Sequence, residues 1–299
     1  MALASCFFPR HRLPLISGCR SLSPLACARA HDTATAPSRA SPKALEAILD
    51  SKLIACLRAQ DGVTAMEAAS AALSGGVSVL EIVMSTPGVL EVVKGLLKFY
   101  PSSVIGVGTV LNVEDARKAV EAGAQFLMSP GTVMEILLDL HNSDVLYIPG
   151  AMTPTEILFA YNTGARIVKI YPASILGGAR YISALKKPFS HVPMVASQGI
   201  ATDSIGRYIK GGASAVVLSD AIFEKEAMRR KDFNKIHRLA HLATLQVHQD
   251  KRSVLDVCFY IHVVEIKRSW EAEAQISEVE RAKAHCMILY PECNRKYII

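Results

Sequence analysis

A lysine stands inside an apolar run in the segment GARIVKIYPAS, which covers residues 164–174. The run is typical of a buried β-strand. Because strand side chains alternate between two faces, Lys169 shares one face with Ile167 and Tyr171. Burying an ammonium group among Ile and Val side chains is costly unless the group is paired or gives up its proton. A lysine in this position therefore indicates a chemical role.

Other strand-like segments carry polar residues that their apolar pattern does not explain. Glu81 lies in VSVLEIVM, Arg58 ends LIACLR, and Thr109 lies near the end of SVIGVGTV. A buried Glu–Lys ion pair is a weak stabiliser compared with apolar packing, so we favour a functional role for Lys169 and Glu81. Arg58 can instead be a strand-end residue whose charge reaches water, and Thr109 can be a turn or helix cap.

Lysine and glutamate in one dry pocket are suited to a particular reaction. An amine held away from water is more easily neutral, and a neutral amine attacks a keto group to form a Schiff base. The Schiff base is an electron sink for cleaving or forming a carbon–carbon bond next to a 2-keto acid. A neighbouring glutamate can transfer the protons. This chemistry needs no metal and no cofactor, and neither His141 nor His191 is placed as a metal ligand.

Composition excludes several other classes of protein. Of the 299 residues, 51% are hydrophobic and 20% are charged, which is typical of a globular protein. No apolar run approaches the roughly 18 residues of a membrane span, so we expect no membrane partner. The net charge of +6 comes with no basic stripe interleaved with aromatic residues, so we expect no nucleic-acid partner.

Residues 41–246 alternate short apolar runs with amphipathic stretches. The strand-like runs are LIACLR, VSVLEIVM, SVIGVGTV, QFLMS, VLYIPG, ARIVKIY, VPMVAS and SAVVLS. Eight strands that are each followed by a helix predict an α/β fold, a (β/α)8 TIM barrel with catalytic residues at the carboxyl ends of its strands. An open doubly wound sheet would carry a Gly-rich loop after the first strand, where this chain has RAQDGV.

The two ends of the chain differ from this central region. Residues 1–40 hold five arginines against one acid, Asp32, with many Ser, Ala and Pro residues. They read as a disordered transit peptide, and we expect a plastid (chloroplast) location, with mitochondrion or cytosol as alternatives. Residues 247–299 hold three of the seven cysteines and the single Trp, and we assign no function to this C-terminal extension. The cysteine spacing predicts no disulfide framework.

Five segments of the central region resemble a known family of enzymes. GGVSVLEIVMSTP, IGVGTVL, AGAQFLMSPG, IPGAMTPTE and VKIYPAS are similar to class I 2-keto-3-deoxy-6-phosphogluconate aldolases, their galactonate relatives and 4-hydroxy-2-oxoglutarate aldolases, in a plant-like organellar form. The resemblance implies a barrel, usually a homotrimer, that reversibly cleaves a 2-keto-3-deoxy sugar acid phosphate or 4-hydroxy-2-oxoglutarate. The products are pyruvate and an aldehyde, either glyceraldehyde 3-phosphate or glyoxylate.

The resemblance also implies roles for individual residues. Lys169 matches the Schiff-base lysine and Glu81 the general acid–base glutamate. Arg58 resembles the carboxylate-binding arginine of galactonate-type members, whereas gluconate-type members have an arginine where this chain has Ser85. The residues implied to bind substrate are Arg58, Thr109, Pro130, Thr153, Tyr171, Ser197, Gly199 and Ser219.

The chain departs from the family in the two loops that bind the distal phosphate. Gln198 and Leu218 stand where glycines are usual, and Asp220 follows Ser219. A side chain can prevent the close approach of backbone N–H groups to an anion. We therefore expect a weaker grip on phosphate, with either a preference for a smaller or unphosphorylated aldehyde such as glyoxylate or a tolerance of several aldehydes.

Three other functions stay open on the sequence. A metal-dependent aldolase would need a cluster of ligands at the strand ends, and a sugar-phosphate isomerase or epimerase would need intact phosphate glycines. A non-catalytic barrel that binds keto acids or a partner protein would need neither Lys169 nor Glu81. Trapping by borohydride separates the Schiff-base enzyme from all three.

Overall fold

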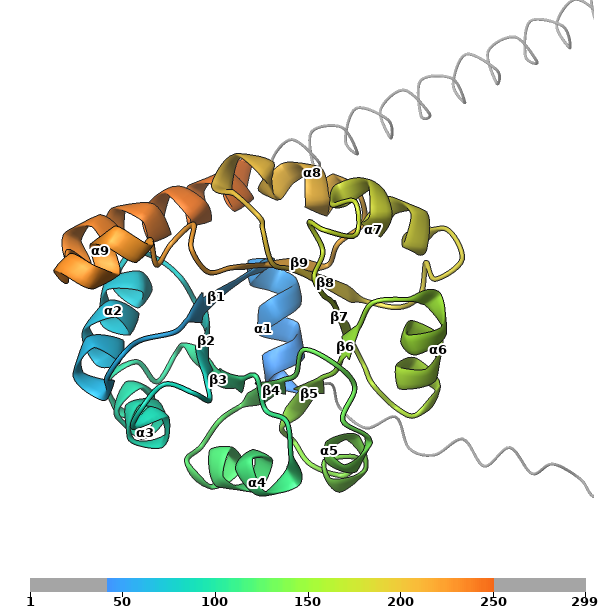
Figure 1. Cartoon of the computed structure of the whole chain (residues 1–299), viewed down its shortest axis with the longest axis horizontal. Coiled ribbons are helices and arrows are strands. Elements are labelled where there is room, and N and C mark those ends of the chain that lie inside the picture. Colours follow the sequence, from blue (N-terminus) through green and yellow to red (C-terminus); the bar gives the residue numbers. More distant parts are fainter. Residues whose placement is uncertain (1–41, 250–299) are drawn as a thin grey trace, which may run out of the picture. The chain divides into compact units, whose positions relative to one another are not determined.

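Parallel strands form a barrel with helices around it in the computed structural model, which describes residues 42–249. Hydrogen bonds join the strands in the order β5-β4-β3-β2-β1-β9-β8-β7-β6, and every pairing is parallel (Figure 1). The strands are β1 (Leu53–Leu57), β2 (Val79–Val83), β3 (Val104–Gly108), β4 (Phe126–Met128), β5 (Leu146–Ile148), β6 (Gly150–Ala151), β7 (Val168–Ile170), β8 (Met194–Ser197) and β9 (Ala215–Leu218).

A helix follows nearly every strand and covers the outside of the barrel. The helices are α1 (Lys43–Ser51), α2 (Gly62–Ser74), α3 (Val89–Phe99), α4 (Val113–Glu121), α5 (Met134–Asp139), α6 (Pro154–Asn162), α7 (Ala179–Lys186), a 3-10 turn (Thr202–Ser204), α8 (Ile205–Lys210) and α9 (Lys225–Arg230). Residues 233–249 are also helical. Within residues 42–249, no helix is long and apolar enough to cross a membrane.

Pro149 joins β5 to β6 and closes the barrel. β5 pairs with β4 and β6 pairs with β7, so one short segment touches both neighbours in turn. Proline has no N–H to donate, which ends the pairing of β5. Its carbonyl oxygen accepts a hydrogen bond from the backbone N–H of Lys169 at 2.8 Å. With β5 and β6 counted as one broken strand, the predicted (β/α)8 barrel is confirmed.

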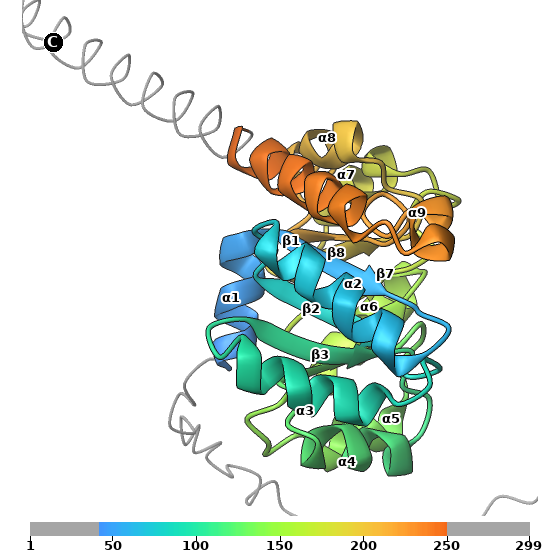
Figure 2. The same ribbon diagram turned by 90° about the vertical axis from the view of Figure 1, so that its left-hand side faces the viewer.

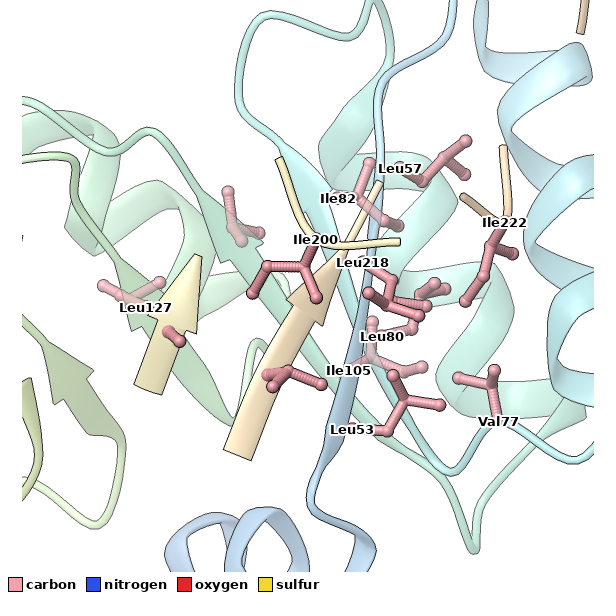
Figure 3. Close-up of a cluster of buried hydrophobic side chains, with 14 of the residues drawn as sticks. Leu53, Leu57, Val77, Leu80, Ile82, Ile105, Leu127, Ile200, Leu218 and Ile222 are labelled. Carbon is pink, nitrogen blue, oxygen red and sulfur yellow. The ribbon is translucent and has the colours of Figure 1, made fainter. Parts of the chain in front are cut away.

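The alternation of strand side chains divides the core into two layers. Inward residues such as Val79, Phe126 and Ile167 fill the barrel interior. Outward residues such as Val168 and Ile170 pack between the strands and the helices. The predicted facing of the lysine strand follows from this division, with Ile167 inside and its neighbour Val168 outside. Figure 3 shows part of the outer layer, where side chains of β1, β2, β3 and β9 meet.

The helix α1 closes the amino-terminal end of the barrel. Its Ala44, Leu45 and Ile48 side chains are buried in the same cluster as the interior strand residues. Figure 1 shows α1 in the middle of the ring of strands, and Figure 2 shows it at the end where the strands begin. The strand–helix rhythm of the sequence does not predict this helix, because it precedes the first strand.

The predicted terminal segments lie almost entirely outside the described residues. Residues 1–41 and 250–299 carry the predicted transit peptide and nearly all of the predicted C-terminal extension. Val247 is buried in the outer core, so core contacts continue one residue past the boundary predicted at 246.

Substitution Ile48→Ala should lower the free energy of unfolding by about 2–5 kcal/mol, because it leaves a hole in the packed interior at the closed end of the barrel. Ile48 is fully buried, whereas the adjacent Leu49 is 37% exposed. The control Leu49→Ala should change the same quantity by less than about 1 kcal/mol. Denaturant titrations followed by circular dichroism would measure both. Equal effects would show that α1 is not packed into the barrel.

Candidate active site

A cavity of about 650 Å³ opens at the carboxyl ends of the strands. This is the end where a barrel of this kind places its functional residues. The cavity brings together nine of the ten residues predicted from the sequence: Arg58, Glu81, Thr109, Pro130, Lys169, Tyr171, Ser197, Gly199 and Ser219.

Lys169 projects from β7 into this cavity and faces Glu81 on β2. Its Nζ lies 4.0 Å from Glu81 Oε1, and the two side chains are only 7% and 1% exposed. The Nζ also lies 5.3 Å from the centre of the Tyr171 ring. A separation of 4.0 Å allows an ion pair but is longer than a hydrogen bond. The Lys169 amine is therefore close to the Glu81 carboxylate without a hydrogen bond to it.

One oxygen of Glu81 is left without a partner. Among residues 42–249, the buried Oε2 atom finds no hydrogen-bond donor. An unsatisfied carboxylate oxygen is costly away from water, and such atoms in native structures call for an explanation. Because Glu81 lines the cavity, a hydroxyl group or a water molecule inside the cavity can donate the missing hydrogen bond.

Two glycines of β3 make room for the interior side chains. A Cβ atom at Gly108 would lie 1.6 Å from Glu81 Oε1, so the carboxylate occupies the space that any other residue would fill. A Cβ atom at Gly106 would lie 2.5 Å from the ring of Phe126. The segment IGVGTVL therefore needs glycine at both positions for packing, a reason that the sequence alone does not reveal.

Cys56 is a cavity residue that the sequence analysis missed. It lies on β1, where its Cα pairs with that of Glu81, and it lines the cavity beside Lys169. Burial raises the pKa of the Cys56 thiol well above its usual value, and the charge of Glu81 raises the pKa further. The thiol is therefore protonated near neutral pH and is a poor nucleophile. Its position two residues before Arg58 on one strand face was the available signal.

Arg58 and Ser85 meet at the mouth of the cavity. The Nη1 atom of Arg58 donates a hydrogen bond of 2.8 Å to Ser85 Oγ. The family resemblance puts a carboxylate-binding arginine at one or the other of these two positions. Their contact explains why the arginine can come from either position. A guanidinium group at the end of β1 or after β2 would reach the same part of the cavity mouth.

Two residues that line the cavity and are not glycine adopt left-handed backbone conformations. Thr109 has φ 58° at the end of β3, and Gln198 has φ 85° at the end of β8. This region is unfavourable for a β-branched residue, so the surrounding structure must hold Thr109 there. Strained backbone of this kind is frequent in functional sites.

The loop after β8 is fastened to the loop after β7. Ser174 Oγ donates a hydrogen bond of 2.8 Å to Gln198 Oε1. The next residue, Gly199, has φ 68°, and a Cβ atom there would lie 2.1 Å from Ser174 Oγ. Gly199 is thus required both by its backbone conformation and by the space that Ser174 occupies.

The expectation for Leu218 was wrong in its physical basis. Leu218 is fully buried in the outer core, in the cluster that Figure 3 shows together with Ile222, and it is not among the residues that line the cavity. Its side chain therefore does not obstruct a ligand. The next two residues, Ser219 and Asp220, do line the cavity, and Asp220 lies 3.8 Å from Lys225 Nζ.

Thr153 is the predicted site residue that does not line the cavity. It caps α6, where its hydroxyl accepts a hydrogen bond of 3.3 Å from the backbone N–H of Glu156. The Glu156 carboxylate accepts hydrogen bonds from the N–H groups of Met152 and Thr153, which lowers its pKa. Thr153 and Glu156 thus form a capping box, in which the Thr153 hydroxyl accepts from the backbone of α6.

Within the described part of the chain, no group of three or more His, Cys, Asp or Glu residues could hold a metal ion.

Comparisons with known proteins match this geometry. The model of the family "KDPG and KHG aldolase" matches residues 45–239. The KHG/KDPG aldolase of Escherichia coli K12 is 30% identical over 179 residues, which cover 60% of this chain and 84% of that protein. The 2-dehydro-3-deoxy-phosphogluconate aldolase of Treponema pallidum is 30% identical over 205 residues, 69% of this chain and 96% of that protein.

Solved structures show the same arrangement of the chain. A KDPG aldolase from Legionella pneumophila, with pyruvate captured as a covalent carbinolamine, is 26% identical with a TM-score of 0.63. The matched region covers 67% of this chain and 98% of that one.

Substitution Gly108→Ala should lower the free energy of unfolding by about 1–3 kcal/mol, because the added methyl overlaps the Glu81 carboxylate. Gly131→Ala is a matched control, since a Cβ atom there would meet no atom within 4 Å. It should change the free energy by less than about 0.5 kcal/mol.

A double-mutant cycle would identify the cause of this loss. If the overlap with Glu81 is responsible, Gly108→Ala should cost much less in a Glu81→Ala background. A cost that is unchanged in that background would mean that another neighbour of Gly108 sets the requirement. Denaturant titrations of the four proteins supply the cycle.

Proposed function

Because the chain belongs to the family of KDPG and KHG aldolases, we propose that Lys169 carries the family reaction in this cavity through a Schiff base. The chain is a class I aldolase, a lyase that cleaves keto-deoxy sugar acid phosphates. The observation that carries the proposal is the buried Lys169–Glu81 pair at the carboxyl ends of the strands. A barrel that only binds keto acids or a partner protein would need neither group.

In the proposed mechanism Lys169 is the nucleophile. Its Nζ attacks C2 of the keto acid, an N–C bond forms, and the carbonyl oxygen takes up a proton to give a carbinolamine. Loss of water gives the imine. The C3–C4 bond then breaks, and its electron pair moves toward the imine to form an enamine while the C4 hydroxyl loses its proton and becomes the aldehyde. Protonation at C3 and hydrolysis release pyruvate and restore the amine.

Glu81 is the proposed general acid–base group for these proton transfers. Its carboxylate lies beside the Lys169 amine, and its Oε2 atom lacks a partner among the described residues. The proton of the carbinolamine hydroxyl or of the C4 hydroxyl can bind at this atom and be returned later. The protonated Cys56 thiol beside it does not compete as a nucleophile.

The remaining lining residues are proposed to orient the substrate. Thr109, Pro130 and Arg58 would receive the carboxylate end, near Tyr171, which packs beside the lysine. The loops after β8 and β9, with Ser197, Gly199 and Ser219, would receive the distal end of the aldehyde portion. Thr153 is not part of this proposal, because its hydroxyl caps α6.

We propose that the distal end grips phosphate weakly. Within the described residues, Arg58 and Lys169 are the cations that line the cavity, and the loop after β9 adds the anionic Asp220. Gln198 presents a side chain where close approach of the backbone would otherwise hold an anion. These features support 4-hydroxy-2-oxoglutarate, which yields glyoxylate, as the substrate that is cleaved at least as well as a sugar acid phosphate.

Location and assembly are proposed from the sequence. The arginine-rich, acid-poor composition of residues 1–40 supports import into a plastid. A homotrimer is proposed from the family resemblance.

Borohydride reduction in the presence of pyruvate should attach the keto acid to Lys169. Peptide mass spectrometry should find the adduct on this residue, and Lys169→Ala should abolish it. Lys225→Ala is a control, since its side chain is 87% exposed and is not among the residues that line the cavity. Folded protein that gives no adduct, or an adduct on another lysine, would favour the non-catalytic barrel.

Substitution Gln198→Gly should raise kcat/KM for 2-keto-3-deoxy-6-phosphogluconate by about tenfold, because glycine adopts φ 85° freely and lets the backbone approach the phosphate. The value for 4-hydroxy-2-oxoglutarate should change less than about threefold. A coupled assay for pyruvate measures both. If the ratio of the two values stays the same, the side chain at 198 does not control phosphate binding.

A further inference from the structure

A chain of buried hydrogen bonds lies directly behind the carboxylate end of the cavity. Tyr147 donates from its hydroxyl to Ser129 Oγ at 3.0 Å, and Ser129 Oγ donates to the carbonyl oxygen of Val110 at 2.5 Å. The Tyr147 oxygen accepts from the backbone N–H of Val133 at 3.1 Å. We call these four residues the Tyr147 network. Ser129 is fully buried and Tyr147 is 4% exposed.

No member of the network lines the cavity, but two members adjoin residues that do. Val110 follows Thr109, and Ser129 precedes Pro130. Tyr147 lies on β5 with its side chain in the outer core, between the strands and the helices. The network therefore ties three separate segments together: the loop after β3, the loop after β4, and β5.

The network holds the strained backbone beside Thr109. The peptide that follows Thr109 donates its N–H, at Val110, to the carbonyl oxygen of Met128 at 3.1 Å. The next carbonyl group, also of Val110, accepts from Ser129. The backbone N–H and carbonyl group of Val110 are thus both hydrogen-bonded, to Met128 at the end of β4 and to Ser129 directly after it. A residue with φ 58° and a branched Cβ keeps this conformation only when its surroundings determine it.

The direction of the hydrogen bonds is fixed along the whole chain. The Val133 N–H donates to Tyr147, Tyr147 donates to Ser129, and Ser129 donates to the Val110 carbonyl group. Each hydroxyl both accepts and donates, so removal of the phenol oxygen leaves the Val133 N–H without this acceptor and Ser129 without this donor. Burial raises the pKa of Tyr147, which keeps the phenol in its donating form.

We propose that Tyr147 is a positioning residue for the aldolase reaction: through Ser129 it sets the place of Thr109 and Pro130, and so the fit of the keto-acid carboxylate. This inference rests on the Schiff-base function proposed above. Tyr147 touches no substrate, so it affects the binding of the keto acid more than the bond-breaking step.

The test measures borohydride-trapped adduct on the full chain as a function of pyruvate concentration. Tyr147→Phe should raise the half-saturating pyruvate concentration by about tenfold, because the carboxylate site is misplaced while the amine is intact. The rate of aldol cleavage at saturating substrate should fall less than about threefold. Ser129→Ala should shift the same pyruvate concentration. The double variant should shift it no further than Ser129→Ala alone, since both changes break one chain.

Tyr208→Phe is the matched control. Tyr208 is also a buried tyrosine of the outer core, 5% exposed, and it lies outside the network. Its variant should leave the half-saturating concentration unchanged. Thermal melting of each variant separates a loss of stability from a loss of positioning, because a purely structural role would lower the melting temperature without shifting pyruvate saturation in the folded protein.

The outcomes distinguish the two proposals. If the wild-type protein is not trapped at all, the Schiff-base function is wrong. If the wild type is trapped and folded Tyr147→Phe shows the same dependence on pyruvate, the positioning role is overturned and the Schiff-base function stands. A shifted dependence in both Tyr147→Phe and Ser129→Ala, with Tyr208→Phe unchanged, supports the positioning role.

Discussion

Two opposite charges placed inside one barrel are the constraint on which the site depends. An amine and a carboxylate at this depth are stable only together, yet Lys169 and Glu81 stand 4.0 Å apart instead of forming a close hydrogen bond. The carboxylate keeps an oxygen without a partner among residues 42–249. Stability alone would favour a closer pair or an apolar substitute. The separation suits the proposed reaction, because an amine that is not hydrogen-bonded to the carboxylate can react with a keto acid in the cavity. The surrounding structure maintains this separation.

The arrangement is maintained by backbone more than by side chains. Gly108 leaves the volume that the Glu81 carboxylate occupies, and Pro149 provides the carbonyl oxygen that receives the N–H of Lys169. The left-handed turn at Thr109 is held through Val110 by the ends of neighbouring strands. Each of these features fixes a residue of the candidate site through the chain itself.

The sequence predicts the features that follow a regular period and misses those that depend on contacts in space. Alternation within its strand placed Lys169 on one face with Ile167, which lies inside the barrel, and the eight apolar runs correspond to the strands. The same alternation does not show that Leu218 faces the outer core unless the register of its strand is known. Thr153 matched a family position, but a local capping bond occupies its hydroxyl. Tyr147 reads as an ordinary apolar strand residue, because its partners lie on other segments.

The position of α1 has a consequence for the order of events in the cavity. Within residues 42–249, the apolar face of α1 fills the amino-terminal end of the barrel, and the cavity opens at the carboxyl ends of the strands. Substrate, aldehyde and water must all pass through that opening. Water that hydrolyses the enzyme-bound pyruvate therefore follows the path that the aldehyde has just left. In the proposed mechanism the covalent imine holds pyruvate until water arrives by the route the aldehyde has left, so the aldehyde is released first and pyruvate second.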